Sequence, residues 1–167
     1  ILRSGRELSG ARPVCLSRSP DYPAPANASD DAAIIDAYGR FGHHLGLAFQ
    51  IQDDYLNIWI DTAESGKTQY SDLRNKKKSL PVTYALGKLQ GADRERLAAI
   101  YADHDMTDDE IAAVLKMLAQ IDAERYTRDL AAHHTQAALA CLDETGIHSA
   151  AHDQLRDLAT LLTGRTA

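Results

Sequence analysis

The chain has 167 residues, 44% of them hydrophobic and 25% charged, and its formal net charge is −6. This balance is typical of one globular domain with a modest core, and the negative charge argues against nucleic acid as the main partner. The two cysteines, Cys15 and Cys141, are far apart, which argues against a disulfide framework or a zinc site and favours a reducing, cytoplasmic compartment. No apolar run is long enough to span a bilayer, so we expect no transmembrane segment.

Residues 1–28 contain four of the five prolines, together with serine, glycine and arginine. They show neither a helical nor a strand period, so we expect a loop or a poorly ordered leader. Residues 29–167 are predicted to form one helical region. Ser29 is its expected N-cap, and Asp30 and Asp31 lie in the first turn, where carboxylates interact favourably with the helix dipole.

A central helix is predicted to include residues 41–59, because apolar side chains cover most of its circumference, as in a helix with protein on nearly every side. Its polar side chains follow one narrow stripe at helical spacing: Gln50, Asp53, Asp54 and Asn57. Adjacent buried carboxylates are costly unless a cation offsets them. Oxygen ligands without cysteine suit Mg²⁺ that also binds substrate phosphates. The alternative is that both aspartates pair with arginines of a neighbouring helix.

A basic segment follows the central helix, after a break predicted at Ser65 and Gly66. Residues 67–78 carry five cations and one carboxylate, a net charge of +4, in a chain that is negative as a whole. These residues are Lys67, Arg74, Lys76, Lys77, Lys78 and Asp72. A basic segment close to an acid pair predicts a diphosphate ligand, with metal ions bridging its oxygens and lysines neutralising the remaining charge.

Further helices are predicted to the end of the chain, and no stretch shows sustained strand alternation, so the predicted fold is all-α. The expected segments are Pro81, as first helical residue, to about Gly91; Asp93 to His104; Thr107 to Leu142 with a break; and Ser149 to Leu162, closed by Gly164. Thr107 and Glu110 have the spacing of a capping box.

Four histidines form two adjacent pairs, His43 with His44 and His133 with His134. Neighbouring side chains on a helix point about 100° apart, so neither pair forms a metal site by itself. We expect surface or packing roles for them.

The runs FGHHLGLAFQIQDDYLNIW and GKTQYSDLRNKKKSLPVTYAL resemble the second aspartate-rich region of the trans-isoprenyl diphosphate synthases, the family of farnesyl and geranylgeranyl diphosphate synthases. The resemblance is strong over residues 32–89. It implies an all-α helical bundle, of which this chain is expected to be the C-terminal half. It also implies the reaction of the family, the Mg²⁺-dependent condensation of isopentenyl diphosphate with an allylic diphosphate.

The resemblance assigns roles to individual residues. Asp53, Asp54 and Asn57 stand at the metal-ligand positions. Substrate contacts are implied for Phe49, Gln50, Lys67, Asp72 and Lys77, and two of these, Lys67 and Lys77, are the expected catalytic residues because they stabilise the departing diphosphate.

Two positions depart from the family pattern. Asn57 stands where the family usually has a third aspartate, which removes one negative charge from the site. Ile60 stands where a glycine is common, and a branched residue is strained there if the backbone needs a glycine-like conformation. The first aspartate-rich motif is also absent, so we expect this chain alone to bind magnesium diphosphate weakly and to turn over little.

Several alternatives stay open for the function and assembly of the chain. It could act as a homodimer, or as a heteromer with a subunit that carries the first aspartate-rich motif. It could be a non-catalytic subunit of a heteromeric prenyl synthase, a fragment of a class I terpene cyclase, or a plain helical interaction module.

Overall fold

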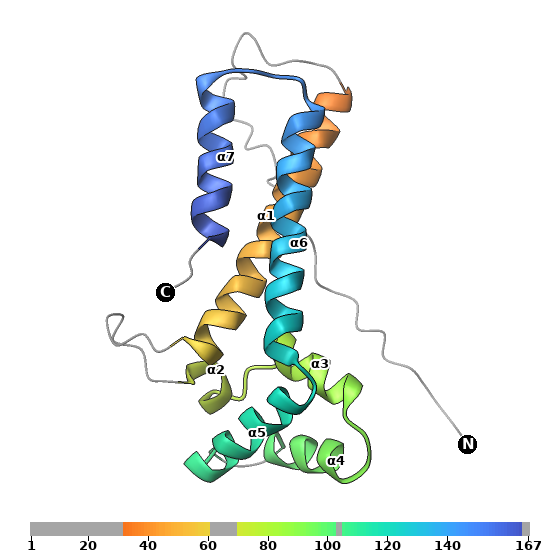
Figure 1. Ribbon diagram of the computed structural model, residues 1–167, viewed down its shortest axis with the longest axis vertical. Coiled ribbons are helices and arrows are strands. Elements are labelled where there is room, and N and C mark those ends of the chain that lie inside the picture. The colour runs from red at the N-terminus through yellow and green to blue at the C-terminus, as the bar shows by residue number, and fades with distance from the viewer. Residues whose placement is uncertain (1–31, 61–69, 103–104, 165–167) are drawn as a thin grey trace, which may run out of the picture. The chain divides into compact units, whose positions relative to one another are not determined.

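The computed structural model describes residues 32–60, 70–102 and 105–164. These ranges form seven helices: α1 (Ala32–Trp59), α2 (Ser71–Arg74), α3 (Leu80–Lys88), α4 (Gly91–Ile100), α5 (Asp108–Gln120), α6 (Ala123–Glu144) and α7 (Ala150–Thr163) (Figure 1). No strand occurs in them, so the predicted all-α fold is confirmed. The predicted leader, the cap at Ser29 with Asp30 and Asp31, the break at Ser65 and Gly66, and Lys67 lie outside the described residues.

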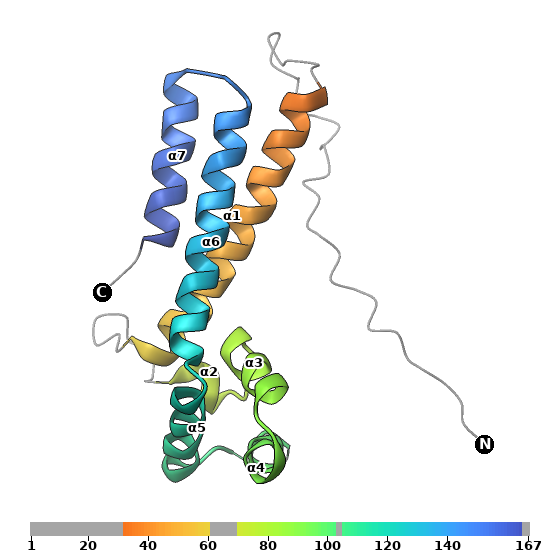
Figure 2. The same cartoon turned by 45° about the vertical axis from the view of Figure 1, so that its right-hand side comes forward.

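The two long helices, α1 and α6, lie side by side and run in opposite directions, with α7 beside α6 (Figures 1 and 2). Buried alanines on both helices, such as Ala48 and Ala138, allow the backbones to approach closely. Farther toward the start of α1, the ring of Phe41 packs in a core cluster with Leu142 of α6 and Ala159 of α7. The packing of α6 and α7 therefore buries one face of α1.

The short helices α2, α3, α4 and α5 gather at the end of α1 where its polar stripe lies (Figure 2). A second core cluster joins them to α1 and includes the side chains of Ile58, Leu73, Val82, Leu97 and Leu118, each at most 1% exposed. Because each of these helices contributes at least one apolar side chain to this cluster, the cluster fixes the last turn of α1 relative to α2 and α3.

The predicted helix ends are largely confirmed. Thr107 Oγ1 accepts the amide of Glu110 at 3.3 Å, and the Thr107 amide donates to Glu110 Oε2 at 2.9 Å, which completes the capping box. The predicted break falls at Ile121 and Asp122, where Asp122 takes a left-handed conformation with φ of 54°. Ser149 Oγ accepts the amide of His152 and begins α7.

Two expectations about residues 60–81 need correction. Ile60 is not among the described non-glycine residues with positive φ, and its amide continues the helical pattern by donating to the Leu56 carbonyl at 3.2 Å. The backbone therefore does not need a glycine at this position. Pro81 is the second residue of α3 rather than the first, since Leu80 precedes it in the helix.

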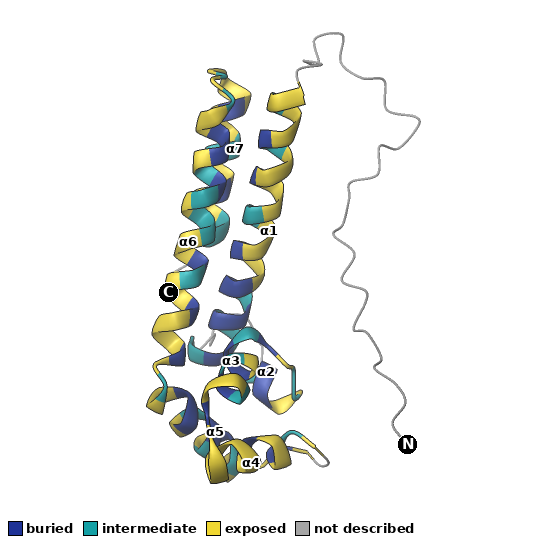
Figure 3. Cartoon of the chain, turned by 90° about the vertical axis from the view of Figure 1, so that its right-hand side faces the viewer, coloured by how far each residue is buried: buried dark blue, intermediate teal, exposed yellow. Residues whose placement is uncertain are grey.

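The α1 helix is not surrounded by protein over its whole length. Ile35, Leu47 and Phe49 are 59%, 36% and 45% exposed, and Figure 3 shows one side of α1 open to solvent. Only the last turns, from Ile51 to Ile60, have no exposed residue. The prediction of a central helix with neighbours on nearly every side is thus wrong for the greater part of α1 in the described chain.

None of the described helices combines the length and the apolar character that crossing a membrane requires.

Candidate functional site

The polar stripe of α1 is present as the sequence spacing predicts. Gln50 Nε2 donates to Asp54 Oδ1 at 3.1 Å, and Asn57 Nδ2 donates to Asp53 Oδ2 at 3.1 Å. Both hydrogen bonds join residues four apart, one turn along the helix. The two amides therefore hold the two carboxylates in fixed orientations at the end of α1.

Lys77, in the connection between α2 and α3, lies among three carboxylates. Its Nζ atom is 2.8 Å from Asp54 Oδ1, 3.0 Å from Asp72 Oδ2 and 3.6 Å from Asp53 Oδ2. We refer to Asp53, Asp54, Asp72 and Lys77 as the Lys77 cluster. A cation of the protein thus pairs with both aspartates of α1. It is a lysine of a connecting segment, whereas the structural alternative predicted arginines of a neighbouring helix.

The end of α2 directs Lys77 back toward Asp72. The Lys77 amide donates to the Asp72 carbonyl and the Lys76 amide donates to the Leu73 carbonyl, both at 2.9 Å. With Lys76 at φ of 49°, these two bonds form a Schellman motif. Glycine usually occupies the left-handed position, so the backbone at Lys76 is strained.

Asp54 connects the cluster to α3. Its Oδ2 atom accepts the backbone amide of Leu80 at 2.8 Å. Leu80 is the first residue of α3, and the side chain of the preceding Ser79 makes no capping hydrogen bond. The carboxylate of Asp54 therefore caps α3 from another helix, at the end where the helix dipole favours negative charge. Its side chain is only 7% exposed, and both of its oxygens accept hydrogen bonds.

The electrostatics of the cluster leave an excess of negative charge. Burial raises the pKa of the Asp72 carboxyl, although the Lys77 ammonium acts in the opposite direction. Burial also lowers the pKa of Lys77, but its hydrogen bond to Asp54 and its contact with Asp72 outweigh this and raise that pKa overall. With Lys77 and all three carboxylates charged, the cluster has a formal net charge of −2.

Asp72 is incompletely satisfied. Its Oδ2 atom forms an ion pair with Lys77 Nζ at 3.0 Å and has no further partner among the described residues. Asp53 is the most accessible carboxylate, with 41% of its side chain exposed. A buried carboxylate oxygen that is paired with a lysine, an accessible carboxylate and a net charge of −2 suit an oxygen-ligand site for a divalent cation such as Mg²⁺, with the cation in place of the ammonium.

The carboxylate oxygens of the cluster are not positioned as a set of metal ligands. Within residues 32–60, 70–102 and 105–164, no three His, Cys, Asp or Glu side chains are arranged to hold a metal ion. Lys77 stands between the carboxylates instead. The residue types therefore fit Mg²⁺, whereas the side-chain positions are those of a site closed by its own lysine.

The remaining predicted site residues lie nearby or outside the described chain. Gln50 is exposed and belongs to the same stripe, and Phe49 precedes it with its ring 45% exposed. Lys67 falls among the residues that the structure does not describe. The sequence spacing thus identified most of the polar residues that meet at this end of α1, but it did not indicate the cap that Asp54 provides to α3.

Sequence reasoning also missed a contact between the histidine pairs. His44 of α1 and His134 of α6 face each other, with 3.0 Å between their Nδ1 atoms. Helical spacing relates residues of one helix only, so the sequence carries no signal for a contact between histidines 90 residues apart.

Comparisons with known proteins relate the chain to one family. A family model described as polyprenyl synthetase matches residues 24–118. A (2E,6E)-farnesyl diphosphate synthase of Mycobacterium tuberculosis is 36% identical over 139 residues, which cover 81% of this chain and 38% of the relative. A heptaprenyl diphosphate synthase component 2 of Geobacillus stearothermophilus is 36% identical over 126 residues, covering 75% of this chain and 38% of that relative.

The structural comparison agrees with the sequence comparison. A geranylgeranyl pyrophosphate synthase of Corynebacterium glutamicum, solved in complex with isoprenyl diphosphate and magnesium, has a TM-score of 0.69 at 28% identity. The match covers 81% of this chain and 38% of that one. The chain therefore spans well under half the length of these relatives.

Proposed function

This chain belongs to the polyprenyl synthetase family, and from that premise we propose that it takes part in prenyl transfer by binding Mg²⁺ and the diphosphate of an allylic substrate at the Lys77 cluster. In this reaction, isopentenyl diphosphate condenses with the allylic diphosphate. The observation that carries the proposal is the meeting of three carboxylates and one lysine at the end of α1, with an excess of negative charge.

The carboxylates of the cluster differ in the roles that they can take. Asp53 is accessible and Oδ2 of Asp72 has no described partner besides Lys77, so these two are the first candidates to hold Mg²⁺. Asp54 also belongs to the proposed ligand set, but its oxygens are engaged by Lys77 and by the amide of Leu80. Oδ1 accepts two donors, Gln50 Nε2 and Lys77 Nζ, whereas Oδ2 accepts only the Leu80 amide, so Oδ2 is the oxygen of Asp54 with a lone pair left for a metal ion. Asn57 holds Asp53 in place and offers an amide oxygen beside it.

The proposed chemistry is stabilisation of a leaving group. A bound Mg²⁺ ion supplies Lewis-acid neutralisation of the diphosphate charge. The Lys77 side chain is 40% exposed, and its ammonium can donate to a diphosphate oxygen once it turns away from the carboxylates. Lys67 is proposed as a second cation for the diphosphate. The exposed faces of Phe49 and Gln50 are proposed to contact the substrate, with the ring of Phe49 against the prenyl chain.

Calorimetric titration of the chain with Mg²⁺ and pyrophosphate tests this function. We expect Mg²⁺-dependent binding that Asp53→Ala removes, because this substitution deletes the most accessible carboxylate of the cluster. Asp36→Ala is the matched control, since Asp36 is an exposed carboxylate of the same helix that pairs with Arg40 instead. Unchanged binding in Asp53→Ala would refute the site, and indifference of the wild-type chain to Mg²⁺ would favour a plain interaction module.

Asn57→Asp is expected to tighten Mg²⁺ binding severalfold, because it adds a fourth carboxylate beside Asp53. Asn75→Asp adds the same charge at an exposed position and is expected to have little effect. The measurement is calorimetric titration with Mg²⁺ alone. Equal affinities of Asn57→Asp and the wild-type chain would show that position 57 does not face the ion.

A second candidate function is that of a subunit in a heteromeric prenyl synthase. Two observations favour it: one similar protein is named as component 2 of a heptaprenyl diphosphate synthase, and α1 exposes Leu47 and Phe49 along its open face. We propose that a second protein surface covers this face, either from a further copy of the chain or from a subunit that carries the first aspartate-rich motif. An assay with both diphosphates and Mg²⁺, combined with light scattering, distinguishes these assemblies: turnover by a homodimer excludes the need for a different subunit.

A further inference from the structure

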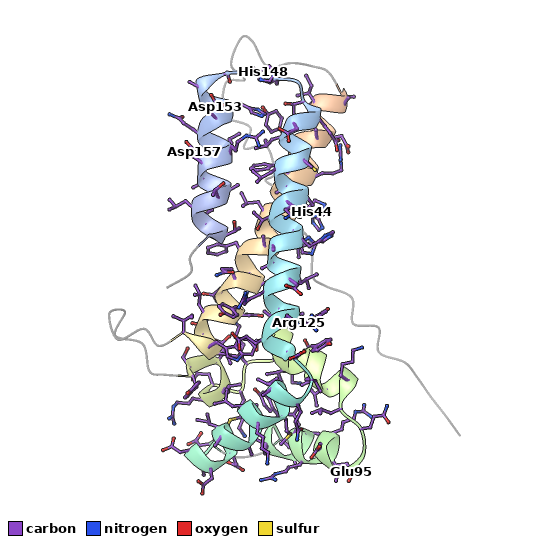
Figure 4. The ribbon with its side chains drawn as sticks, in the orientation of Figure 1. His44, Glu95, Arg125, His148, Asp153 and Asp157 are labelled. Atoms are coloured by element: carbon purple, nitrogen blue, oxygen red, sulfur yellow. The ribbon has the colours of Figure 1, made fainter. Side chains whose placement is uncertain are left out.

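The histidine contact between α1 and α6 is separate from the Lys77 cluster. His44 precedes Asp53 by nine residues, about 14 Å along the helix. Figure 4 shows His44 beside α6, away from the end where α2 and α3 lie. In this contact, the Nδ1 atoms of His44 and His134 are 3.0 Å apart. Both residues are half-buried, so solvent has access to the pair.

The remaining two histidines flank this contact. The ring of His43 lies against His44 and the ring of His133 lies against His134, with centroid distances of 5.5 and 5.4 Å. His43 and His133 are exposed. Adjacent residues on a helix point in different directions, so one member of each pair faces the other helix and one faces solvent. Four imidazoles from two helices therefore gather at one place.

The facing nitrogens are of a kind that binds borderline divalent metals. In a hydrogen bond between two neutral rings, one Nδ1 atom donates its proton and the other accepts it with a lone pair. Burial, and after it the neighbouring imidazoles, lower the pKa of both rings, which favours their neutral forms. A neutral imidazole nitrogen is the usual histidine ligand of Zn²⁺.

The distance between the two nitrogens also fits a metal ion. Zn–N bonds of about 2.0–2.1 Å at a tetrahedral angle separate two ligand nitrogens by about 3.3 Å. The observed 3.0 Å needs to open only slightly for an ion to lie between the two Nδ1 atoms, with each neutral imidazole carrying its proton on Nε2 instead. The nearest cation along α1, Arg40, is paired with Asp36 and Glu144, and its charge still contributes to lowering the pKa of His44.

We propose that His44 and His134 form a two-histidine site for Zn²⁺ or a similar borderline divalent metal ion, which joins α1 to α6. No third His, Cys, Asp or Glu ligand completes the site within the described residues, so water fills the remaining positions. Mg²⁺ is a poor occupant, because it prefers oxygen ligands. The site does not depend on the proposed prenyl transfer, and it would join the two longest helices of the described chain.

Calorimetric titration of the untagged chain with ZnCl₂ tests the proposal. We expect one Zn²⁺ per chain, and we expect His44→Gln and His134→Gln each to weaken binding at least tenfold. His148→Gln is the matched control, because His148 is exposed in the connection between α6 and α7. Mg²⁺ in excess is expected not to compete. Absence of Zn²⁺ binding, or binding that both substitutions leave unchanged, would overturn the proposal.

Two further measurements keep the test decisive if a variant fails to fold. In the wild-type chain, the imidazole NMR signals of His44 and His134 are expected to shift at the first equivalent of Zn²⁺, ahead of those of His148. His43→Gln and His133→Gln are expected to weaken binding less than the inner substitutions. If they weaken it more, or if the signals of the outer rings shift first, the exposed pair holds the ion and the inner site is excluded.

Discussion

Lys77→Met is expected to lower the free energy of unfolding by about 2–3 kcal/mol in the absence of divalent cations. Removing one partner of a buried ion pair typically costs about 3–5 kcal/mol, because the other partner keeps its desolvated charge. The effect is smaller here because 40% of the Lys77 side chain is exposed and water screens its charge. Urea unfolding followed by circular dichroism measures the change.

The same variant separates the structural ion pairs of Lys77 from its proposed role in diphosphate binding. Without the ammonium, the three carboxylates repel one another, so we expect Mg²⁺ to stabilise Lys77→Met more than it stabilises the wild-type chain. Pyrophosphate binding is expected to fall, since a cation for the diphosphate is lost. Lys78→Met is the control, because Lys78 is an exposed lysine of the same basic segment. If Mg²⁺ stabilises Lys77→Met no more than it stabilises Lys78→Met, the carboxylates do not form a cation site.

Asp54→Ala is expected to destabilise the protein by about 3–5 kcal/mol, the largest effect of any single substitution in the cluster. The change removes the 2.8 Å hydrogen bond to Lys77 and leaves the amide of Leu80 without its acceptor at the start of α3. By contrast, Asp53→Ala is expected to change stability by less than about 1 kcal/mol, because Asp53 is 41% exposed and 3.6 Å from Lys77.

This contrast is measurable by thermal and urea unfolding of the two variants side by side. Asp54→Asn is informative in addition, because it keeps an oxygen for the Leu80 amide but loses the negative charge near Lys77. We expect its stability to lie between those of Asp54→Ala and the wild-type chain. Equal destabilisation by Asp53→Ala and Asp54→Ala would contradict the division into an accessible ligand and a structural carboxylate.

The local features of the fold could be predicted because they depend on residues close in sequence. The polar stripe of α1 follows from helical spacing, and its hydrogen bonds join residues four apart. The caps at Thr107 and Ser149 likewise depend on three-residue spacings. These interactions form wherever the segment is helical, so the tertiary structure is not needed to foresee them.

The pairing of Lys77 could not be foreseen in the same way. Its position depends on a Schellman motif whose left-handed residue is Lys76, without the glycine that usually signals such a turn. The cap of α3 by Asp54 joins residues 26 apart, and the contact of His44 with His134 joins residues 90 apart. Only the packing of the helices decides contacts of this range.

The exposed face of α1 shows a different limit of sequence reasoning. Leu47 and Phe49 indicate a surface that packs against protein or ligand, but the pattern does not say which molecule supplies the other side. In the described chain, α6 and the short helices cover only part of α1. The apolar character of α1 was thus predictable from the sequence, whereas the extent to which other helices cover it was not.

Because Asp54 binds both Lys77 and the first turn of α3, a ligand at the proposed site would alter the amide hydrogen bond at the start of α3. One oxygen holds Lys77 and the other holds the first turn of α3. A diphosphate that draws Lys77 away changes the charge balance on Asp54 and strengthens its hold on the Leu80 amide, whereas a metal ion that recruits Asp54 weakens that hold. Amide exchange at the start of α3 would then slow with an anion alone and quicken with the metal, so the first turn of α3 would show which of the two is bound.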